Sequence, residues 1–355
     1  GIYLEPRVGN EWKIRGNVVN DIENTGIYLQ GSSISTSDLS NNGGTGAQVY
    51  VIGNTTNGGK NGISLQGSGG ITIKDILKNK FLGFEGGVGI TVNAPNSLVA
   101  NNYVQPSGLG IAKGISLEVG GSGSDVVFNS VNVTGTDVVN GQGIEVNGGS
   151  NYRVKNNIFA NNGGGNGVNI KSDISSFDWD YNGYYSSGVY FGKYLNQEYN
   201  SITSWRSAVL KDANTVVVNP MFTSNTNLSI NHTLLNDVGT TIAEVTDDIT
   251  GASRAAQPDI GATEYTPCPI DAGINEIVGI SVIIPNVSTP QPIEVELQNQ
   301  GTSNLTSVTI NWEINGVVQT PYNWTGNLAE KESEVVTIGT YQFSAGTSYG
   351  FIIYT

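Results

Sequence analysis

An internal repeat in the first half of the chain constrains the fold most. A glycine followed by an apolar–polar–apolar triplet recurs with spacings of 25, 36, 27, 25, 29 and 24 residues, from Gly1 through Gly26, Gly62, Gly89, Gly114 and Gly143 to Gly167. A repeat of this length is typical of solenoids, in which each unit buries its apolar face by stacking on the next unit.

Alignment of the repeats places similar residues in columns. The first and third positions after glycine are apolar: Ile2, Ile27, Ile63, Ile90, Ile115, Ile144 and Val168, then Leu4, Leu29, Leu65, Val92, Leu117, Val146 and Ile170. The position between them holds Tyr3, Tyr28, Ser64, Thr91, Ser116, Glu145 and Asn169. This alternation predicts a strand with one face in the core and the other in water.

A second strand repeats in phase, and each copy carries an asparagine near the same point: Asn17, Asn54, Asn79, Asn102, Asn129 and Asn157. Asparagine suits a tight bend, and stacked asparagine side chains can hydrogen-bond along a stack. The sequence therefore predicts an all-β chain that begins with a right-handed parallel β-helix of about 25 residues per coil. The longest repeat contains an insertion, residues 32–46, which we expect to leave the stack as a loop.

The charge and composition of the chain disfavour several classes of binding partner. The net charge of −14 disfavours nucleic acid and anionic membranes, and no apolar run approaches the length of a membrane span. The single cysteine, Cys268, excludes an intramolecular disulfide.

The segment after the repeats contains FDWDYNGYY from Phe177, NPMF from Asn219 and PDIGATEY from Pro258. It resembles bacterial secreted proteins of the right-handed parallel β-helix repeat class. The resemblance covers residues 177–265 and implies that residues from about 176 to 266 form the last coils and a closing cap. It also implies structural roles for Arg254 and Asp259.

Residues 267–355 lose the repeat after Pro267-Cys268-Pro269 and show strands separated by turns. Asn315-Gly316 predicts a hairpin, and Trp312 a sandwich core residue. We expect an immunoglobulin-like β-sandwich here, after a β-helix over residues 1–266. The region is similar to CARDB-like modules, which in Bacteroidetes often follow β-helices in proteins exported by type IX secretion, so the resemblance implies an extracellular or cell-surface location.

Both ends of the chain suggest a longer protein. Gly1 already opens a repeat, so the solenoid is expected to continue upstream, and the sandwich is expected to be incomplete at Thr355. Other domains of that longer chain are expected partners.

Catalytic candidates are sparse. Motifs of polygalacturonase-like hydrolases are absent, and the only histidine, His232, lies outside the repeats. Glu118 and Glu145 on adjacent coils could be spaced as a glycosidase pair, whereas Arg153, Lys155 and Lys171 could serve a lyase as bases. The alternative interpretation of these charged residues is that they form an ordinary polar surface in contact with solvent. Three carboxylates near the last coil, Asp173, Asp178 and Asp180, could bind Ca²⁺, although an EF-hand frame is missing.

Binding requires less than catalysis. Tyr3 and Tyr28 share the outward column, and Tyr50 is expected nearby, so these rings could stack on sugars. Polar neighbours of the column are Gln66, Asn93 and Asn147. We therefore expect a surface module that binds polysaccharide or cell-surface glycan, or acts as an adhesive stalk. A polysaccharide lyase or glycoside hydrolase acting on an acidic polysaccharide is the alternative, and a pure spacer is a third.

Overall fold

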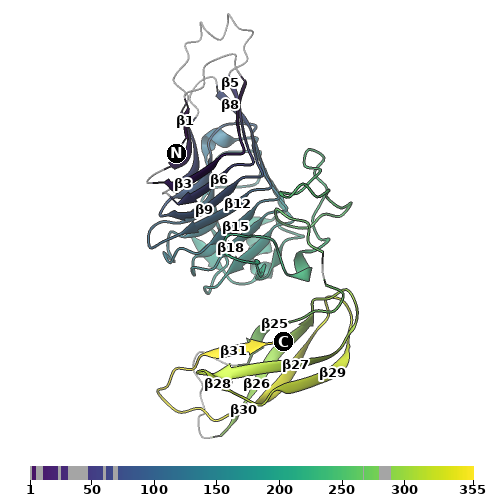
Figure 1. The fold of residues 1–355 in the computed structure, drawn as a ribbon. Coiled ribbons are helices and arrows are strands. Elements are labelled where there is room, and N and C mark those ends of the chain that lie inside the picture. The colour runs from purple at the N-terminus through teal and green to yellow at the C-terminus, as the bar shows by residue number, and fades with distance from the viewer. Residues whose placement is uncertain are drawn as a thin grey trace, which may run out of the picture. The chain divides into compact units, whose positions relative to one another are not determined.

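A computed structural model describes residues 2–4, 11–22, 25–30, 47–58, 61–66, 71–266, 268–279 and 289–355. Before residue 75, the described side chains are those of residues 13–20, 27, 51–58 and 62. The chain forms two compact units, residues 1–265 and 266–355 (Figure 1).

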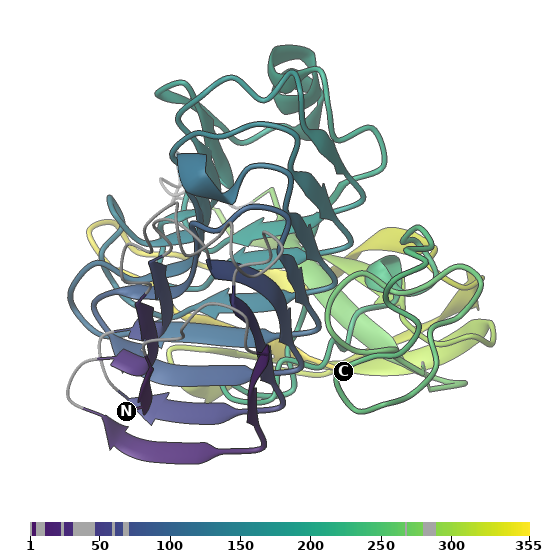
Figure 2. The same ribbon diagram turned by 90° about the horizontal axis from the view of Figure 1, so that it is seen from above.

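Within the described residues, the first unit winds through three parallel sheets, whose strands stack coil on coil (Figures 1 and 2). Sheet A contains, in spatial order, β1 (Ile2–Leu4), β4 (Thr25–Gln30), β7 (Asn61–Gln66), β10 (Val88–Val92), β13 (Lys113–Leu117), β16 (Gln142–Val146), β19 (Asn166–Ile170), β22 (Gly192–Tyr194) and an antiparallel β23 (Gln197–Tyr199). Sheet B contains β2 (Glu11–Arg15), β5 (Ala47–Ile52), β8 (Ile71–Leu77), β11 (Leu98–Ala100), β14 (Asp125–Val127), β17 (Arg153–Lys155) and β20 (Asp178–Asp180). Sheet C contains β3 (Val18–Ile22), β6 (Thr55–Gly58), β9 (Lys80–Glu85), β12 (Tyr103–Ser107), β15 (Ser130–Val133), β18 (Ile158–Asn161), β21 (Gly183–Ser186) and β24 (Val216–Val217).

The register of sheet A confirms the columns and with them the predicted β-helix. Ile90 pairs with Ile115, and Ile115 with Ile144, so that each isoleucine lies above the next. All three are fully buried in the central core. The short η1 (Val119–Gly121) follows β13.

The repeated glycine is explained by a close approach between coils. A Cβ atom on Gly114 would overlap the Val131 side chain and the carbonyl oxygen of Gly143. Any side chain at this corner would therefore push sheet C away from sheet A.

The buried asparagines form a hydrogen-bonded ladder between sheets B and C. The backbone N–H and Nδ2 of Asn102 both donate to Oδ1 of Asn129, at 3.1 and 2.8 Å. The same pattern links Asn129 to Asn157, and Asn157 to Asn182. The sequence predicted a tight bend near each asparagine, and the backbone there is left-handed. The left-handed residues lie one position before the asparagines, at Gly16, Gly53, Lys78, Asn101, Phe128, Asn156 and Tyr181.

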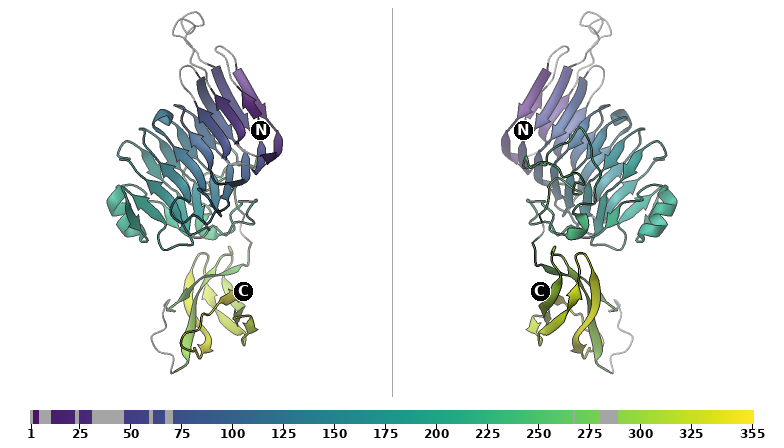
Figure 3. Two further views of the ribbon diagram at one scale, coloured as in Figure 1. Left: turned by 90° about the vertical axis from the view of Figure 1, so that its left-hand side faces the viewer. Right: turned by 90° about the vertical axis from the view of Figure 1, so that its right-hand side faces the viewer.

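An aromatic cap closes the end of the stack that is farther from the N-terminus (Figure 3). Helix α2 (Ile202–Val209) inserts the fully buried Trp205, whose ring makes edge contacts with Tyr184, Phe191 and Tyr199. A Cβ atom on Gly192 would lie 2.9 Å from this indole, which explains why glycine replaces the usual Ile or Val there.

Asp212 joins this cap to the ladder. It is buried and accepts hydrogen bonds from the indole of Trp205 at 2.7 Å, the hydroxyl of Tyr184 at 2.9 Å and the hydroxyl of Thr215 at 2.5 Å. The Thr215 hydroxyl in turn accepts from the backbone of Asn182 at 3.0 Å. Burial raises the pKa of Asp212 to about 6.

Residues 219–265, here called the strap, contain η2 (Thr233–Leu235) and run back along the side of the β-helix. The strap binds the row of left-handed bend residues. Lys78 pairs with Asp247 at 2.6 Å, and Arg254 donates to Asn101 at 2.7 Å while its guanidinium lies 4.1 Å from the Phe128 ring centre. The β-helix end is thus closed by α2, whereas the strap covers a flank instead of closing the end.

Asp259 fixes the strap internally. Its carboxylate accepts from the backbone N–H groups of Asp237 and Tyr265, and Arg254 pairs with Glu264 at 2.7 Å. Burial, aided by the charges of Glu264 and Asp237, raises the pKa of Asp259 from 3.8 to about 7. These contacts agree with structural roles for Arg254 and Asp259.

This raised pKa predicts how stability depends on pH. The folded state binds more protons at Asp259 than the unfolded state between about pH 4 and 7, so its contribution to stability is lost as pH rises through that window. Asparagine cannot titrate. We expect the stability advantage of the wild type over Asp259→Asn to be larger at about pH 4 than at about pH 8 in denaturant titrations. An equal difference at both pH values would contradict the raised pKa.

The second unit consists of antiparallel sheets consistent with the predicted β-sandwich. One sheet is ordered β25 (Ala272–Val278), β26 (Gln291–Asn299), β30 (Ser333–Tyr341), and the other β28 (Val317–Val318), β27 (Leu305–Ile314), β29 (Tyr322–Leu328), with β31 (Phe351–Tyr354) also paired to β27. Trp312 is buried in its core, as predicted. Asn315-Gly316 forms the two-residue hairpin between β27 and β28.

Candidate functional site

The three sheets of the β-helix differ in what lies on their outer faces. Apolar clusters join the strap to outward residues of sheets B and C, among them Val127, Ile158 and Tyr103. The sheet B face also carries the ion pairs Arg153–Asp125 and Lys155–Asp178. The outer face of sheet A instead carries three parallel columns of polar side chains, which makes it the candidate site.

Backbone pairing defines these columns. The central one runs Ser116, Glu145, Asn169 and Lys193. One flanking column holds Lys113, Gln142 and Asn166, and the other holds Asn93, Glu118, Asn147 and Lys171. Because each column crosses successive coils, groups far apart in sequence lie one strand spacing apart.

Glu145 is the centre of a closed charge cluster. Its carboxylate lies 2.5 Å from the Lys113 ammonium and 2.6 Å from that of Lys171, and its side chain is only 3% exposed. Burial alone would raise the pKa of Glu145, but the hydrogen bonds from Lys113 and Lys171 outweigh it and lower the pKa. Glu145 is therefore held in its charged form.

The structure also brings Glu118 close to Glu145. Nδ2 of Asn147 donates to both carboxylates, at 2.9 Å for Glu118 and 3.1 Å for Glu145. The two accepting oxygens therefore lie within about 6 Å of each other, close to the spacing of a glycosidase pair. A glycosidase also needs one carboxylic acid that stays protonated. The lowered pKa of Glu145 does not suit that role.

The two other cationic candidates lie on sheet B, away from this cluster. Arg153 makes a two-point contact with Asp125, at 2.9 and 2.6 Å, and reaches Glu244 at 3.1 Å. Lys155 pairs with Asp178 at 2.8 Å. Both cations are neutralised by neighbours instead of being presented to an acidic polymer.

The three calcium candidates have separate partners. Asp178 pairs with Lys155, Asp173 accepts from Ser175, and Asp180 accepts from the backbone and side chain of Asn214. Within the described ranges, no group of three His, Cys, Asp or Glu side chains is arranged to hold a metal ion. The structure therefore does not unite these carboxylates into a calcium site.

The binding candidates fall into two groups. Asn93 and Asn147 lie on the outer edge of sheet A beside Glu118, whereas the side chains of Tyr3, Tyr28, Tyr50 and Gln66 lie outside the described residues. The backbones of Tyr3 and Tyr28 pair directly in sheet A. Tyr50 is not their neighbour, because β5 belongs to sheet B, where it pairs with Lys13 and Asp75.

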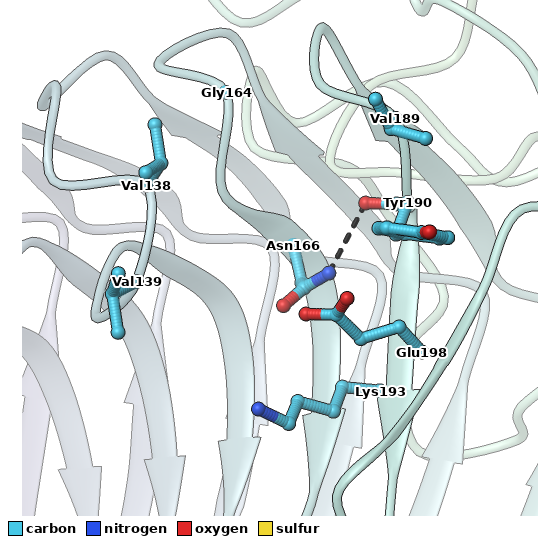
Figure 4. A pocket seen from close by; sticks show the side chains of 8 residues that line it. All are labelled: Val138, Val139, Gly164, Asn166, Val189, Tyr190, Lys193 and Glu198. Atoms are coloured by element: carbon cyan, nitrogen blue, oxygen red, sulfur yellow. Dashed lines mark hydrogen bonds between the residues drawn. The ribbon is translucent and has the colours of Figure 1, made fainter.

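A cavity of about 300 Å³ opens on the last coils of sheet A (Figure 4). Asn166, Lys193 and Glu198 line its polar side, from β19, β22 and β23. Loops before three successive strands supply the other wall, with Val138, Val139, Gly164, Val189 and Tyr190.

Both charged groups in this cavity are unpaired among the described residues, in contrast to those around Glu145. Nδ2 of Asn166 donates to the backbone oxygen of Tyr190 at 3.1 Å, which leaves its Oδ1 available. In the part of the chain that the structure describes, neither the Lys193 ammonium nor the Glu198 carboxylate has a hydrogen-bond or ion-pair partner, and the two point into different parts of the cavity (Figure 4). An unpaired cation, an unpaired anion and a free amide oxygen beside an aromatic ring fit a polar ligand with apolar parts.

Sequence analysis missed Asn166, Lys193, Glu198 and Tyr190. The signal was weak, since the triplet at residues 192–194 continues the column but starts with glycine in place of Ile or Val. The register shows that Lys193 follows Asn169 in the central column.

His232 is not a site residue. It is 2% exposed, and its Nδ1 accepts from the backbone of Leu234 at 3.2 Å at the start of η2.

None of the helices in the described part of the chain has both the length and the apolar character that a membrane span requires.

Comparison with known proteins bears on the first unit alone. Residues 1–175 match the family model described as the right handed beta helix region. No curated protein and no solved structure gives a significant match to the chain. The family match identifies a right-handed β-helix domain in residues 1–175, and the parallel sheets continue this architecture to β24.

Proposed function

We propose that the β-helix domain binds a saccharide on the outer face of sheet A, with the cavity at Asn166, Lys193 and Glu198 as its centre. The observation that carries the proposal is the set of unpaired polar groups opposite an aromatic and aliphatic wall. Sugars present hydroxyl groups at their edges and C–H groups on their faces. Tyr190 offers a ring for such a face, and Lys193 and Glu198 can bond to hydroxyls.

Binding fits these residues better than catalysis. A lyase base must reach the substrate, yet Lys155 and Lys171 are each within 2.8 Å of a carboxylate. The carboxylate pair near Asn147 lacks a raised pKa at Glu145. The cavity groups, by contrast, are free to form new bonds.

The wider setting is also a proposal. We infer an extracellular or bacterial cell-surface protein in which the β-helix acts as an adhesive module, followed by an immunoglobulin-like domain that resembles CARDB-like modules. The resemblance of residues 177–265 to secreted β-helix proteins supports this inference, as does the acidic composition. The likeness of residues 267–355 to CARDB-like modules adds support, since such modules in Bacteroidetes often follow β-helices in proteins exported by type IX secretion.

Glycan-array screening of the intact chain, followed by calorimetry with the best ligand, tests the proposal. We expect Lys193→Ala or Tyr190→Ala to weaken binding about tenfold, because each removes a central contact. Lys155→Ala on sheet B serves as the control and should bind like the wild type. Equal losses in all three variants would place the ligand elsewhere, and no binding to any glycan would favour a spacer.

A glycoside hydrolase is the second candidate, supported by the proximity of Glu118 and Glu145. Incubation with polysaccharides and assay of new reducing ends distinguishes it from a binder. Release of sugar that is lost in both Glu118→Gln and Glu145→Gln would replace the binding proposal. An increase in ultraviolet absorbance, caused by unsaturated sugar products, would indicate a lyase instead.

A further inference from the structure

The cavity wall contains more exposed apolar surface than a plain sugar needs. Val138, Val139 and Val189 are 58%, 74% and 72% exposed, and Tyr190 is 38% exposed. Val138 and Val139 precede β16, whereas Val189 and Tyr190 precede β22 two strands further on, so the two groups border one cavity from opposite sides (Figure 4). Apolar side chains gathered in this way mark a surface that an apolar group of a partner covers.

The opposite wall specifies the polar part of that partner. Lys193 supplies a donor, and Glu198 and the Oδ1 atom of Asn166 supply acceptors. One positive and one negative group leave the wall without net charge. A complementary ligand is neutral overall and has both an acceptor and a donor close to its apolar group.

Chain-wide charge points the same way. With a net charge of −14, the protein repels anionic sugars at long range. A neutral hexose would avoid the repulsion, but with its C–H face on Tyr190 its edge would place hydroxyls against Val189. Burial of hydroxyls there would leave them without partners, which costs free energy.

We propose that the cavity takes an N-acetylated amino sugar, an inference that rests on the proposed saccharide binding. The acetamido methyl group lies against Val189 and Tyr190. Its carbonyl oxygen accepts from Lys193, and its N–H donates to Glu198 or Asn166. The cavity volume of about 300 Å³ is at the small end for ligand sites, which suits a single substituted ring.

Calorimetry on the intact chain with two tetrasaccharides of the same linkage tests this inference. N-acetylchitotetraose carries acetamido groups where cellotetraose carries hydroxyls. We expect the chitin fragment to bind at least about tenfold more tightly. One buried methyl group and one amide hydrogen bond together contribute more than the roughly 1.4 kcal/mol that a tenfold change in affinity requires. Both ligands are neutral, so the comparison is free of charge effects.

Variants assign the preference to the wall. Val189→Thr keeps the side-chain shape but places a hydroxyl against the methyl group, and should reduce the preference several-fold without weakening cellotetraose binding. The matched control is Val119→Thr, since Val119 is 69% exposed but does not line the cavity. An unchanged preference in Val189→Thr would overturn the inference.

Failure of this inference is distinguishable from failure of the proposed function. Equal affinity for the two tetrasaccharides, or array binding confined to glycans without N-acetyl groups, overturns the ligand class and leaves saccharide binding in place. Absence of binding across the whole array overturns both.

Discussion

Replacement of Asn129 by alanine is expected to lower the free energy of unfolding of the β-helix unit by about 3–5 kcal/mol. Asn129 is fully buried in the middle of the ladder. Its Oδ1 accepts both donors of Asn102, and its Nδ2 donates to the carbonyl oxygen of Val99 at 2.9 Å. Alanine leaves these buried groups with fewer hydrogen-bond partners and out of reach of water. Each unsatisfied buried group lowers the free energy of unfolding by about 1–3 kcal/mol.

The matched control is Asn162→Ala. The exposed Asn162 donates to Oδ1 of Asn132 at 2.8 Å, so it makes an Asn–Asn bond between coils within reach of water. Its loss should cost no more than about 0.5 kcal/mol. Urea titrations followed by a probe in the β-helix unit compare the two variants. Similar losses in both would mean that the buried ladder contributes no more than a surface bond.

Trp205→Ala is expected to destabilise the same unit by about 3–5 kcal/mol. The indole fills the space above Gly192 and contacts Tyr184, Phe191 and Tyr199. Its removal opens a cavity at the end of the stack and takes one hydrogen bond from the buried Asp212. Because each coil is held by its neighbours, a weakened last coil also promotes fraying along the solenoid.

Trp205→Phe separates these two contributions. Phenylalanine retains most of the ring contacts but cannot donate to Asp212, so we expect a loss of about 1–2 kcal/mol. Thermal or urea unfolding of the intact chain measures both variants. Equal destabilisation by phenylalanine and alanine would show that the hydrogen bond, and not the packing, holds the cap.

Much of the β-helix could be predicted because its pattern is local and repeated. The isoleucine column at Ile90, Ile115 and Ile144 reports an inward-facing strand in every coil, and the buried asparagines report the bend. The last coil was harder to recognise. Gly192 breaks the column because Trp205, thirteen positions further on, occupies the space of the missing side chain.

The sequence could not predict that the strap lies along the side of the β-helix, because the contacts that hold it there are long-range. Lys78 and Asp247 are 169 residues apart, and neither carries a local signal for the other. The resemblance to β-helix proteins correctly implied structural roles for Arg254 and Asp259. It did not show that they hold a segment against the row of bend residues.

The sequence predicted the candidate site only in part, because the site also depends on contacts between residues far apart in the chain. The outward column predicted that Glu118 and Glu145 would be neighbours, and they share Asn147. Sequence could not show that Lys113 and Lys171 close over Glu145, while Lys193 one coil beyond Asn169 is unpaired. Pairing of charges depends on side-chain reach across coils, which periodicity does not encode.

Hydrogen–deuterium exchange of the intact chain, with and without its best-binding oligosaccharide, tests the central claim most directly. The account predicts slower exchange in the loops at residues 134–141, 162–165 and 187–191 and in β22 and β23, with no change in the strap or in residues 266–355. Protection confined to sheet B, the strap or the second unit, with none around the cavity, would contradict a saccharide site on sheet A.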